Sequence, residues 1–176
     1  MVEIRLATEE DVPGIITLMQ ANKRENLSVE EQRRHGFVQG NMTQSAMIER
    51  IHALGVDVAV DKGLVVAAAL TTRIGESAMP GPLGAALEVA PPGLYPGQFY
   101  FYGPAVVDVA YRGQHLLTRI LDAQFGRLSA CFSQVAAFID EGNPVSMAAH
   151  IRLGFEDIGQ FFFKDRSYHL LRRDLT

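Results

Sequence analysis

The residues that are most able to take part in binding or catalysis lie in one short segment, residues 106–117. An apolar run ends near Asp108, the turn Tyr111-Arg112-Gly113 follows, and an amphipathic helix begins. The first N–H groups of a helix lack partners inside the helix, and the helix dipole favours an anion beside them. The segment therefore predicts a phosphate site at this turn. Its expected binding residues are Arg112, Gly113, Gln114, His115, Leu116 and Leu117.

The positions of apolar residues predict the elements that hold this turn in place. Alternating or wholly apolar stretches predict strands at residues 2–7, 56–60, 64–72, 98–109, 134–139, 155–163 and 168–174. Apolar residues at helical spacing predict helices at residues 8–21, 43–53, 112–129 and 143–154. Ser28 with Glu31 predicts a short helix at 28–34 that begins with a capping box, and Asn143 before Pro144 is a typical helix start.

The order of these elements predicts the class of fold. Strands 98–109 and 134–139 are separated by a helix, so we expect them to be parallel neighbours joined by a crossover. The hairpins near both ends of the chain are antiparallel, and Gly103-Pro104 predicts a bend within strand 98–109. Residues 75–104 hold six of the eight prolines and predict a long loop with one helical turn near residues 83–87. We expect one α/β domain, residues 1–176, with a mixed sheet of about seven strands and helices on both faces.

The composition excludes several classes of function. The chain has 176 residues, with 16 Lys and Arg against 20 Asp and Glu, and one cysteine. A net charge of −4 argues against a nucleic-acid or membrane binder, whereas a phosphate site built from N–H groups needs no basic patch. One cysteine excludes an internal disulfide and a cysteine-rich zinc site, and we expect no metal. No signal peptide or membrane-spanning run is recognisable, so the expected location is the cytoplasm.

Taken together, these segments resemble the GNAT superfamily of acyl-CoA-dependent N-acetyltransferases over nearly the whole chain. The order of elements is similar, and residues 4–13 resemble that family's first strand and helix. Tyr111-Arg112-Gly113 resembles the start of its pyrophosphate-binding turn. Residues 143–155 end in Leu-Gly-Phe and resemble its second cofactor-side helix. The resemblance implies acetyl-CoA or a related acyl-CoA as co-substrate, with Asn143 and Ser146 among the residues that bind it.

The sequence departs from the family pattern at two places. The family has Arg or Gln, two residues, Gly, one residue, and then Gly or Ala. Counted from Arg112, the small positions are His115 and Leu117, which add bulk where the diphosphate is expected. Both residues can adopt helical angles, and His115 can also donate a hydrogen bond to a phosphate.

Many members carry a Tyr four residues before the Gly of Leu-Gly-Phe, and that Tyr protonates the leaving thiolate. The corresponding residue is His150, and imidazole is a competent general acid near neutral pH. The structural alternative is a helix histidine that bonds a carbonyl.

The resemblance also implies direct attack by a neutral amine on the thioester, with a strand N–H stabilising the oxyanion. The amides of the pantetheine arm are expected to pair with the main chain of Val107 and Val109. The strand before the turn has Tyr100 and Tyr102 but no acidic residue, so no general base is assigned. The acceptor is expected between residues 25–40 and residues 75–98, which include Glu25 and Glu88.

We therefore expect an N-acetyltransferase that transfers an acetyl group from acetyl-CoA to a primary amine of a small molecule or a peptide. The chain is expected to act alone or as a homodimer. The substituted glycines leave a second reading open, in which a GNAT-like domain has lost catalysis and binds acyl-CoA or another ligand as a sensor or partner module. A purely structural α/β domain is the third reading.

Overall fold

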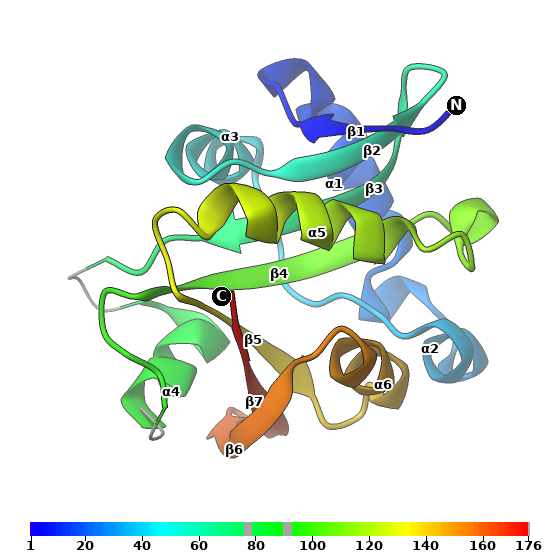
Figure 1. Ribbon diagram of the computed structural model, residues 1–176. Coiled ribbons are helices and arrows are strands. Elements are labelled where there is room, and N and C mark those ends of the chain that lie inside the picture. The colour runs from blue at the N-terminus through cyan, green and yellow to red at the C-terminus, as the bar shows by residue number, and fades with distance from the viewer. Residues whose placement is uncertain (76–78, 90–92, 176) are drawn as a thin grey trace.

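The structure is a computed structural model that describes residues 1–75, 79–89 and 93–175. Its centre is a seven-stranded sheet with the strand order β1-β2-β3-β4-β5-β7-β6 (Figure 1). The strands are β1 (Glu3–Leu6), β2 (Asp57–Asp61), β3 (Leu64–Thr72), β4 (Phe99–Val107), β5 (Gln134–Asp140), β6 (Glu156–Phe163) and β7 (Arg166–Asp174). Strands β4 and β5 are parallel and the other neighbouring strands are antiparallel, which confirms the predicted mixed sheet.

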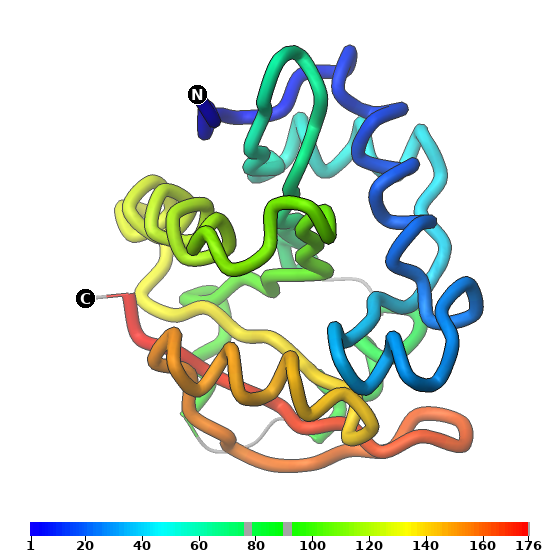
Figure 2. Tube along the Cα trace, turned by 90° about the vertical axis from the view of Figure 1, so that its right-hand side faces the viewer, coloured from blue at the N-terminus to red at the C-terminus, as the bar shows by residue number. Residues whose placement is uncertain are grey.

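Helices cover both faces of the sheet, as predicted. They are α1 (Val12–Ala21), α2 (Val29–His35), α3 (Gln44–Ala53), α4 (Gly81–Val89), α5 (Leu116–Leu128) and α6 (Pro144–Arg152). Figures 1 and 2 show α5 and α6 on one face and α1 and α3 on the other. Ile120 and Leu121 of α5 are buried against the first face, while Ile15 of α1 and Met47 of α3 are buried against the second. Within the described residues, no helix is both long and apolar enough to cross a membrane.

Local sequence signals set the ends of several helices. The Ser28 hydroxyl accepts the Glu31 N–H at 3.2 Å and the Glu31 carboxylate accepts the Ser28 N–H at 2.8 Å, which confirms the predicted capping box at the start of α2. Asn143 caps α6 by accepting the Ser146 N–H at 3.4 Å. These bonds satisfy N–H groups that have no partner within the helix.

Two predicted boundaries are wrong. Helix α5 begins at Leu116 instead of residue 112, because His115 has left-handed angles (φ 57°, ψ 23°) that interrupt the helix on its N-terminal side. The proline-rich stretch contains the nine-residue helix α4 where one turn was predicted. Ala86 of this helix is buried in a cluster with Phe99 and Phe101, so tertiary packing extends it. Residues 76–78 and 90–92, also predicted as loop, lie outside the described residues.

The feature that matters most for function is a separation of β4 from β5. Their pairing covers three positions, from Phe99 opposite Gln134 to Phe101 opposite Ala136, and stops just before the predicted bend at Gly103-Pro104. Beyond it, β4 continues to pair with β3, and the Asp108 N–H donates to the Val66 carbonyl at 2.8 Å. The N–H and C=O groups of successive residues point to opposite sides of a strand. Because those of Asp108 face β3, the N–H and C=O groups of Val107 point away from β3 and into the gap between β4 and β5.

Candidate functional site

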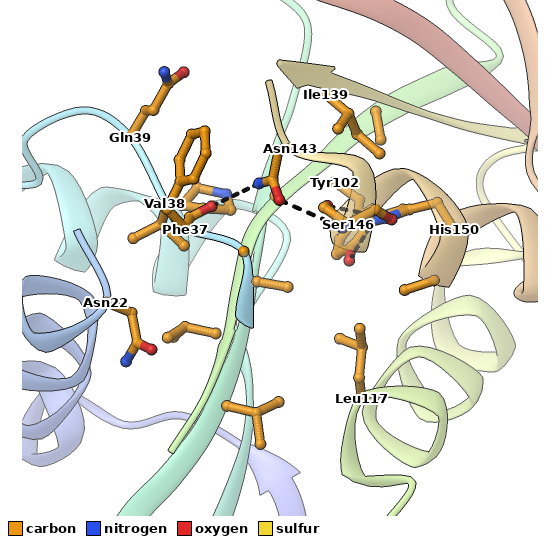
Figure 3. A pocket seen from close by; sticks show the side chains of 18 of the residues that line it. Asn22, Phe37, Val38, Gln39, Tyr102, Leu117, Ile139, Asn143, Ser146 and His150 are labelled. Carbon is orange, nitrogen blue, oxygen red and sulfur yellow. Dashed lines mark hydrogen bonds between the residues drawn. The ribbon is translucent and has the colours of Figure 1, made fainter. Parts of the chain in front are cut away.

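A cavity of about 890 Å³ opens where β4 and β5 separate. Its walls come from β4, β5, the N-terminal end of α5, one side of α6 along its length, and residues 35–42 at the end of α2 and after it. Figure 3 shows it with Asn22, Phe37 and Gln39 on one side and Leu117 and His150 on the other. The predicted site residues that line it are Val107, Arg112, Gly113, His115, Leu116, Leu117, Asn143, Ser146 and His150.

Two predicted cofactor residues are not part of the cavity wall. Val109 lies in a 3-10 turn after the end of β4 and is 64% exposed, so its main chain does not continue the strand edge. The Gln114 amide turns back to the Ala110 carbonyl at 3.4 Å. Both predictions assumed that the strand or the helix extended further than it does.

The N-terminus of α5 has the properties of an anion site. Its first helical bond runs from the Arg119 N–H to the His115 carbonyl at 3.1 Å, and no side chain caps it. The N–H groups of Leu116 and Leu117 therefore have no partner within the helix, and both residues line the cavity. The Leu116 side chain is buried in the core, so only its main chain is available, whereas the Leu117 side chain points into the cavity (Figure 3).

His115 has a backbone conformation that favours glycine, which is the residue that the family pattern places there. The expectation that His115 adopts helical angles is therefore wrong, because its φ is 57°. A left-handed residue other than glycine costs roughly 1 kcal/mol. The His115 side chain is exposed, so this strain is not offset by burial.

We expect His115→Gly to raise the melting temperature by about 2–4 °C, because relief of this strain contributes roughly 1 kcal/mol. Differential scanning fluorimetry measures the shift. Lys62→Gly is the matched control, since Lys62 also has a left-handed φ, of 51°, in the β2–β3 turn away from the cavity. A gain for Lys62→Gly without one for His115→Gly would show that the His115 side chain makes a stabilising contact.

Arg112 directs its side chain away from the uncapped end of α5. Its Nη2 donates to Asn22 Oδ1 at 2.6 Å and its Nε donates to the Val107 carbonyl at 3.2 Å. Burial lowers the pKa of the Arg112 guanidinium, although an arginine stays charged at neutral pH. Arg112 thus joins the end of α1 to the end of β4, and Asn22 is a partner that the sequence did not suggest.

Asn143 links the segment after α2 to the start of α6 through hydrogen bonds. Besides its cap, its Nδ2 donates to the Phe37 carbonyl at 3.0 Å (Figure 3). Gly36 permits this approach, since a Cβ there would lie 2.7 Å from Asn143 Oδ1, and its φ of 71° also favours glycine. Both polar ends of the Asn143 side chain are therefore occupied by protein groups.

His150 is buried and makes two close polar contacts. Its Nδ1 lies 2.7 Å from the Ser146 carbonyl and its Nε2 lies 3.0 Å from the Tyr102 hydroxyl. The Tyr102 ring packs against both His150 and Phe155, with ring centroids 5.5 and 5.9 Å away, and these two rings also contact each other at 5.3 Å. This pair joins β4 to α6 at the cavity wall, and Tyr102 was not among the predicted site residues.

These contacts define where the protons lie. A carbonyl can only accept, so Nδ1 of His150 carries a hydrogen, and in a neutral ring Nε2 then accepts the Tyr102 hydroxyl proton. Burial lowers the pKa of His150, partly opposed by the bond to Ser146, and burial raises the pKa of Tyr102. Both shifts favour a neutral imidazole and a protonated phenol.

Asp140, at the end of β5, is a carboxylate in the cavity wall that the sequence did not single out. Burial by itself would raise the pKa of its carboxyl, but bonds from Arg166, the Gly142 N–H and the Gln39 amide together hold that pKa below its usual range. An ionised carboxylate with three donors is a poor general base. Glu25 and Glu88 are not among the described residues that line the cavity.

The two loops expected to flank the acceptor, residues 25–40 and 75–98, contribute unequally to the cavity wall. Residues 35–40 line the cavity, followed by Asn41 and Met42, whereas Leu83 is the described residue from 75–98 that reaches it. Phe101 and Phe138 add aromatic surface on the side of the sheet that faces α4. The end of the cavity away from α5 is therefore largely apolar.

The structure resembles solved acetyltransferases over nearly its full length. No protein-family model matches the sequence, and no curated protein matches it either. An N-acetyltransferase from Staphylococcus aureus Mu50 superposes with a TM-score of 0.67 at 16% identity, covering 100% of this chain and 99% of that chain. The protein yncA from Salmonella typhimurium, solved with its cofactor acetyl-CoA, gives a TM-score of 0.69 at 17% identity, covering 100% and 95%. A GNAT superfamily phosphinothricin acetyltransferase from Sinorhizobium meliloti, in complex with acetyl-CoA, gives 0.65 at 20% identity, covering 98% and 88%. The arrangement of sheet and helices is thus shared despite the low identities.

Proposed function

Since this chain has the GNAT fold, we propose that it is an N-acyltransferase that transfers an acetyl group from acetyl-CoA to a primary amine. One observation carries the proposal. The uncapped N-terminus of α5 opens into a cavity formed where β4 and β5 separate, so an anion site and a free strand edge share one space. An acyl-CoA has a diphosphate that suits the first feature and an amide-containing arm that suits the second.

The residues of the cavity can divide this binding between them. The N–H groups of His115, Leu116 and Leu117 would hold the diphosphate. The Val107 N–H would donate to a pantetheine carbonyl, since the Val107 carbonyl already accepts from Arg112. Acetyl-CoA supplies an acyl group activated as a thioester, which a neutral amine can attack directly. No metal or thiol relay is needed for such a transfer.

Tyr102 and His150 would manage the proton that the amine loses. We infer that the proton enters at the Tyr102 hydroxyl oxygen while the phenol proton moves to His150 Nε2, and that it returns by the same route to the departing sulfur. One proton leaves nitrogen and one reaches sulfur, so no other base or acid is required. His150 remains the predicted acid, but it would act through Tyr102.

Ligand binding and turnover test the proposal separately. We expect saturating acetyl-CoA to raise the melting temperature by about 5–10 °C, since ligand at 100 times its dissociation constant contributes about 2.7 kcal/mol. We also expect steady release of free CoA with a panel of primary amines, measured with a thiol reagent. No thermal shift at millimolar acetyl-CoA would contradict the proposal.

A specific observation keeps the second candidate function in view. The Leu117 side chain points into the cavity (Figure 3). His115 also lines the cavity, at a position where the family pattern has a small residue. In a sensor or partner module, acetyl-CoA would raise the melting temperature while no amine in the panel released CoA. Binding without turnover is therefore the result that favours this alternative.

A further inference from the structure

Arg50 of α3 is an unusual cation in the cavity wall. Its Nη1 makes two long contacts, to Met42 Sδ at 3.6 Å and to the Ala46 carbonyl at 3.4 Å. Its Nε is buried without a partner, and no carboxylate among the described residues lies within 4.0 Å of its guanidinium nitrogens. The neighbouring Glu49 acts on it only at a distance.

An arrangement of this kind is costly for the folded protein. Arg50 is half-buried, and this burial lowers the pKa of its guanidinium because the charged form loses part of its hydration. Removing a charge from water without a counter-ion is unfavourable, and buried arginines are normally paired. Arg127 and Arg166 have Asp57 and Asp140 as partners, and Arg112, which lines the same cavity without a carboxylate, donates at 2.6 and 3.2 Å to Asn22 and to the Val107 carbonyl. Arg50 has neither kind of close acceptor. The missing partner of Arg50 is therefore expected to come from outside the chain.

The position of Arg50 indicates which ligand would supply that partner. Helix α3 covers the face of the sheet opposite α5, yet Arg50 and the N-terminus of α5 line the same cavity (Figure 1). In the proposed function the end near α5 holds the diphosphate, so the acceptor enters at the other end. Met42 and Leu83 share that end with Arg50 and make its surroundings apolar.

We propose that the acceptor is an amine that also carries an oxyanion, a carboxylate or a phosphate, and that Arg50 binds this group. The planar guanidinium fits either oxyanion through paired N–H donors. The assignment deepens the proposed function and rests on it. Arg50 is a specificity-determining residue in this scheme and takes no part in the proton transfer.

Matched pairs of acceptors test the assignment. The twenty common amino acids are compared with their α-amides, and O-phosphoethanolamine with ethanolamine, by the rate of CoA release. We expect at least one oxyanion-bearing acceptor to exceed its neutral partner in kcat/KM by about tenfold or more, the usual strength of a charge-assisted pair. A larger ratio for the phosphate pair would identify a phosphate ester as the natural oxyanion. Ratios near one throughout would overturn the proposal.

The variant Arg50→Met distinguishes a role of Arg50 in recognising the acceptor from a role in stabilising the fold. We expect this variant to bring the ratio of kcat/KM between the oxyanion-bearing acceptor and its neutral partner to within about twofold of one. It should also raise the melting temperature by about 2–4 °C, because an unpaired charge is replaced by an apolar side chain of similar length. Arg73→Met, at an exposed residue that follows β3 and does not line this cavity, is the control that should change neither value. A preserved ratio in Arg50→Met would overturn the assignment.

A binding measurement distinguishes failure of this inference from failure of the proposed function. Calorimetry with N-acetyl-L-methionine and N-acetyl-L-methioninamide requires no turnover. We expect the acid to bind the unmodified protein at least about tenfold more tightly than the amide, and Arg50→Met to lose this difference. That result with no CoA release would reject catalysis but keep the oxyanion site. Equal binding within this pair and also within the pair O-phosphoethanolamine and ethanolamine would reject the site even if amines are acetylated.

Discussion

Tyr102→Phe is expected to lower kcat by about 100-fold or more, because general acid–base groups typically contribute 10²–10⁴-fold. The substitution removes the hydroxyl that lies 3.0 Å from His150 Nε2 and keeps the ring that packs against Phe155. Acetyl-CoA affinity should stay within about twofold, since the phenol is not part of the anion site. Steady-state CoA release at saturating acetyl-CoA measures kcat, and a thermal titration measures affinity.

Tyr100→Phe is the matched control for this experiment. Tyr100 lies two residues earlier on β4, is fully buried, and donates its hydroxyl to Gln124 at 3.3 Å on the core side of α5. It does not line the cavity, so its loss should change stability but not kcat. Equal losses of activity in the two variants would show that Tyr102 acts through packing alone.

The pH profile identifies the contribution of His150 in the same reaction. His150 must be neutral to accept the phenol proton, and burial holds its pKa below 6.5. When kcat/KM is expressed per neutral amine, the form that attacks, activity should therefore fall as His150 becomes protonated at low pH. His150→Ala should cut turnover sharply without weakening acetyl-CoA binding, and the acidic limb of kcat/KM should disappear. If His150→Ala keeps the acidic limb of the kcat/KM profile unchanged, that limb comes from the titration of another group.

The second large effect is expected at the anion site. His115→Asp should weaken acetyl-CoA binding by about 10- to 100-fold relative to His115→Asn, because a carboxylate beside the diphosphate costs roughly 1–4 kcal/mol. The two variants have the same shape, and both Asn and Asp tolerate the left-handed angles at this position. Both also suit the N-terminus of a helix, so the folded protein should remain stable. The difference between them therefore isolates charge.

Isothermal titration with acetyl-CoA at two salt concentrations measures this difference. Repulsion between exposed charges is screened, so the gap between the variants should narrow as salt increases. Identical affinities for His115→Asp and His115→Asn would place the diphosphate elsewhere, and the anion site at α5 would have to be abandoned. Lys62→Asp, which changes charge at a left-handed residue that does not line the cavity, should change the affinity much less than His115→Asp.

Much of the fold follows from local patterns. Among the described residues, alternating or wholly apolar runs located every strand and helical spacing located four of the six helices, because burial of one face requires those periods. The capping box at Ser28 and the cap at Asn143 were also predictable, since each involves residues three positions apart. Helix α4 was predicted as a single turn, because its full length depends on packing against the strands β4 and β6.

By itself, the sequence determined the mixed sheet, the crossover that makes β4 and β5 parallel, and the turn that opens α5, since each depends on residues close together in the chain. Only the tertiary structure decided which polar groups meet. The Tyr102–His150 pair spans 48 residues and the Arg112–Asn22 bond spans 90, so neither leaves a local pattern. The lack of a carboxylate at Arg50 is likewise a property of the packed molecule, because a sequence does not show which charges are left without partners.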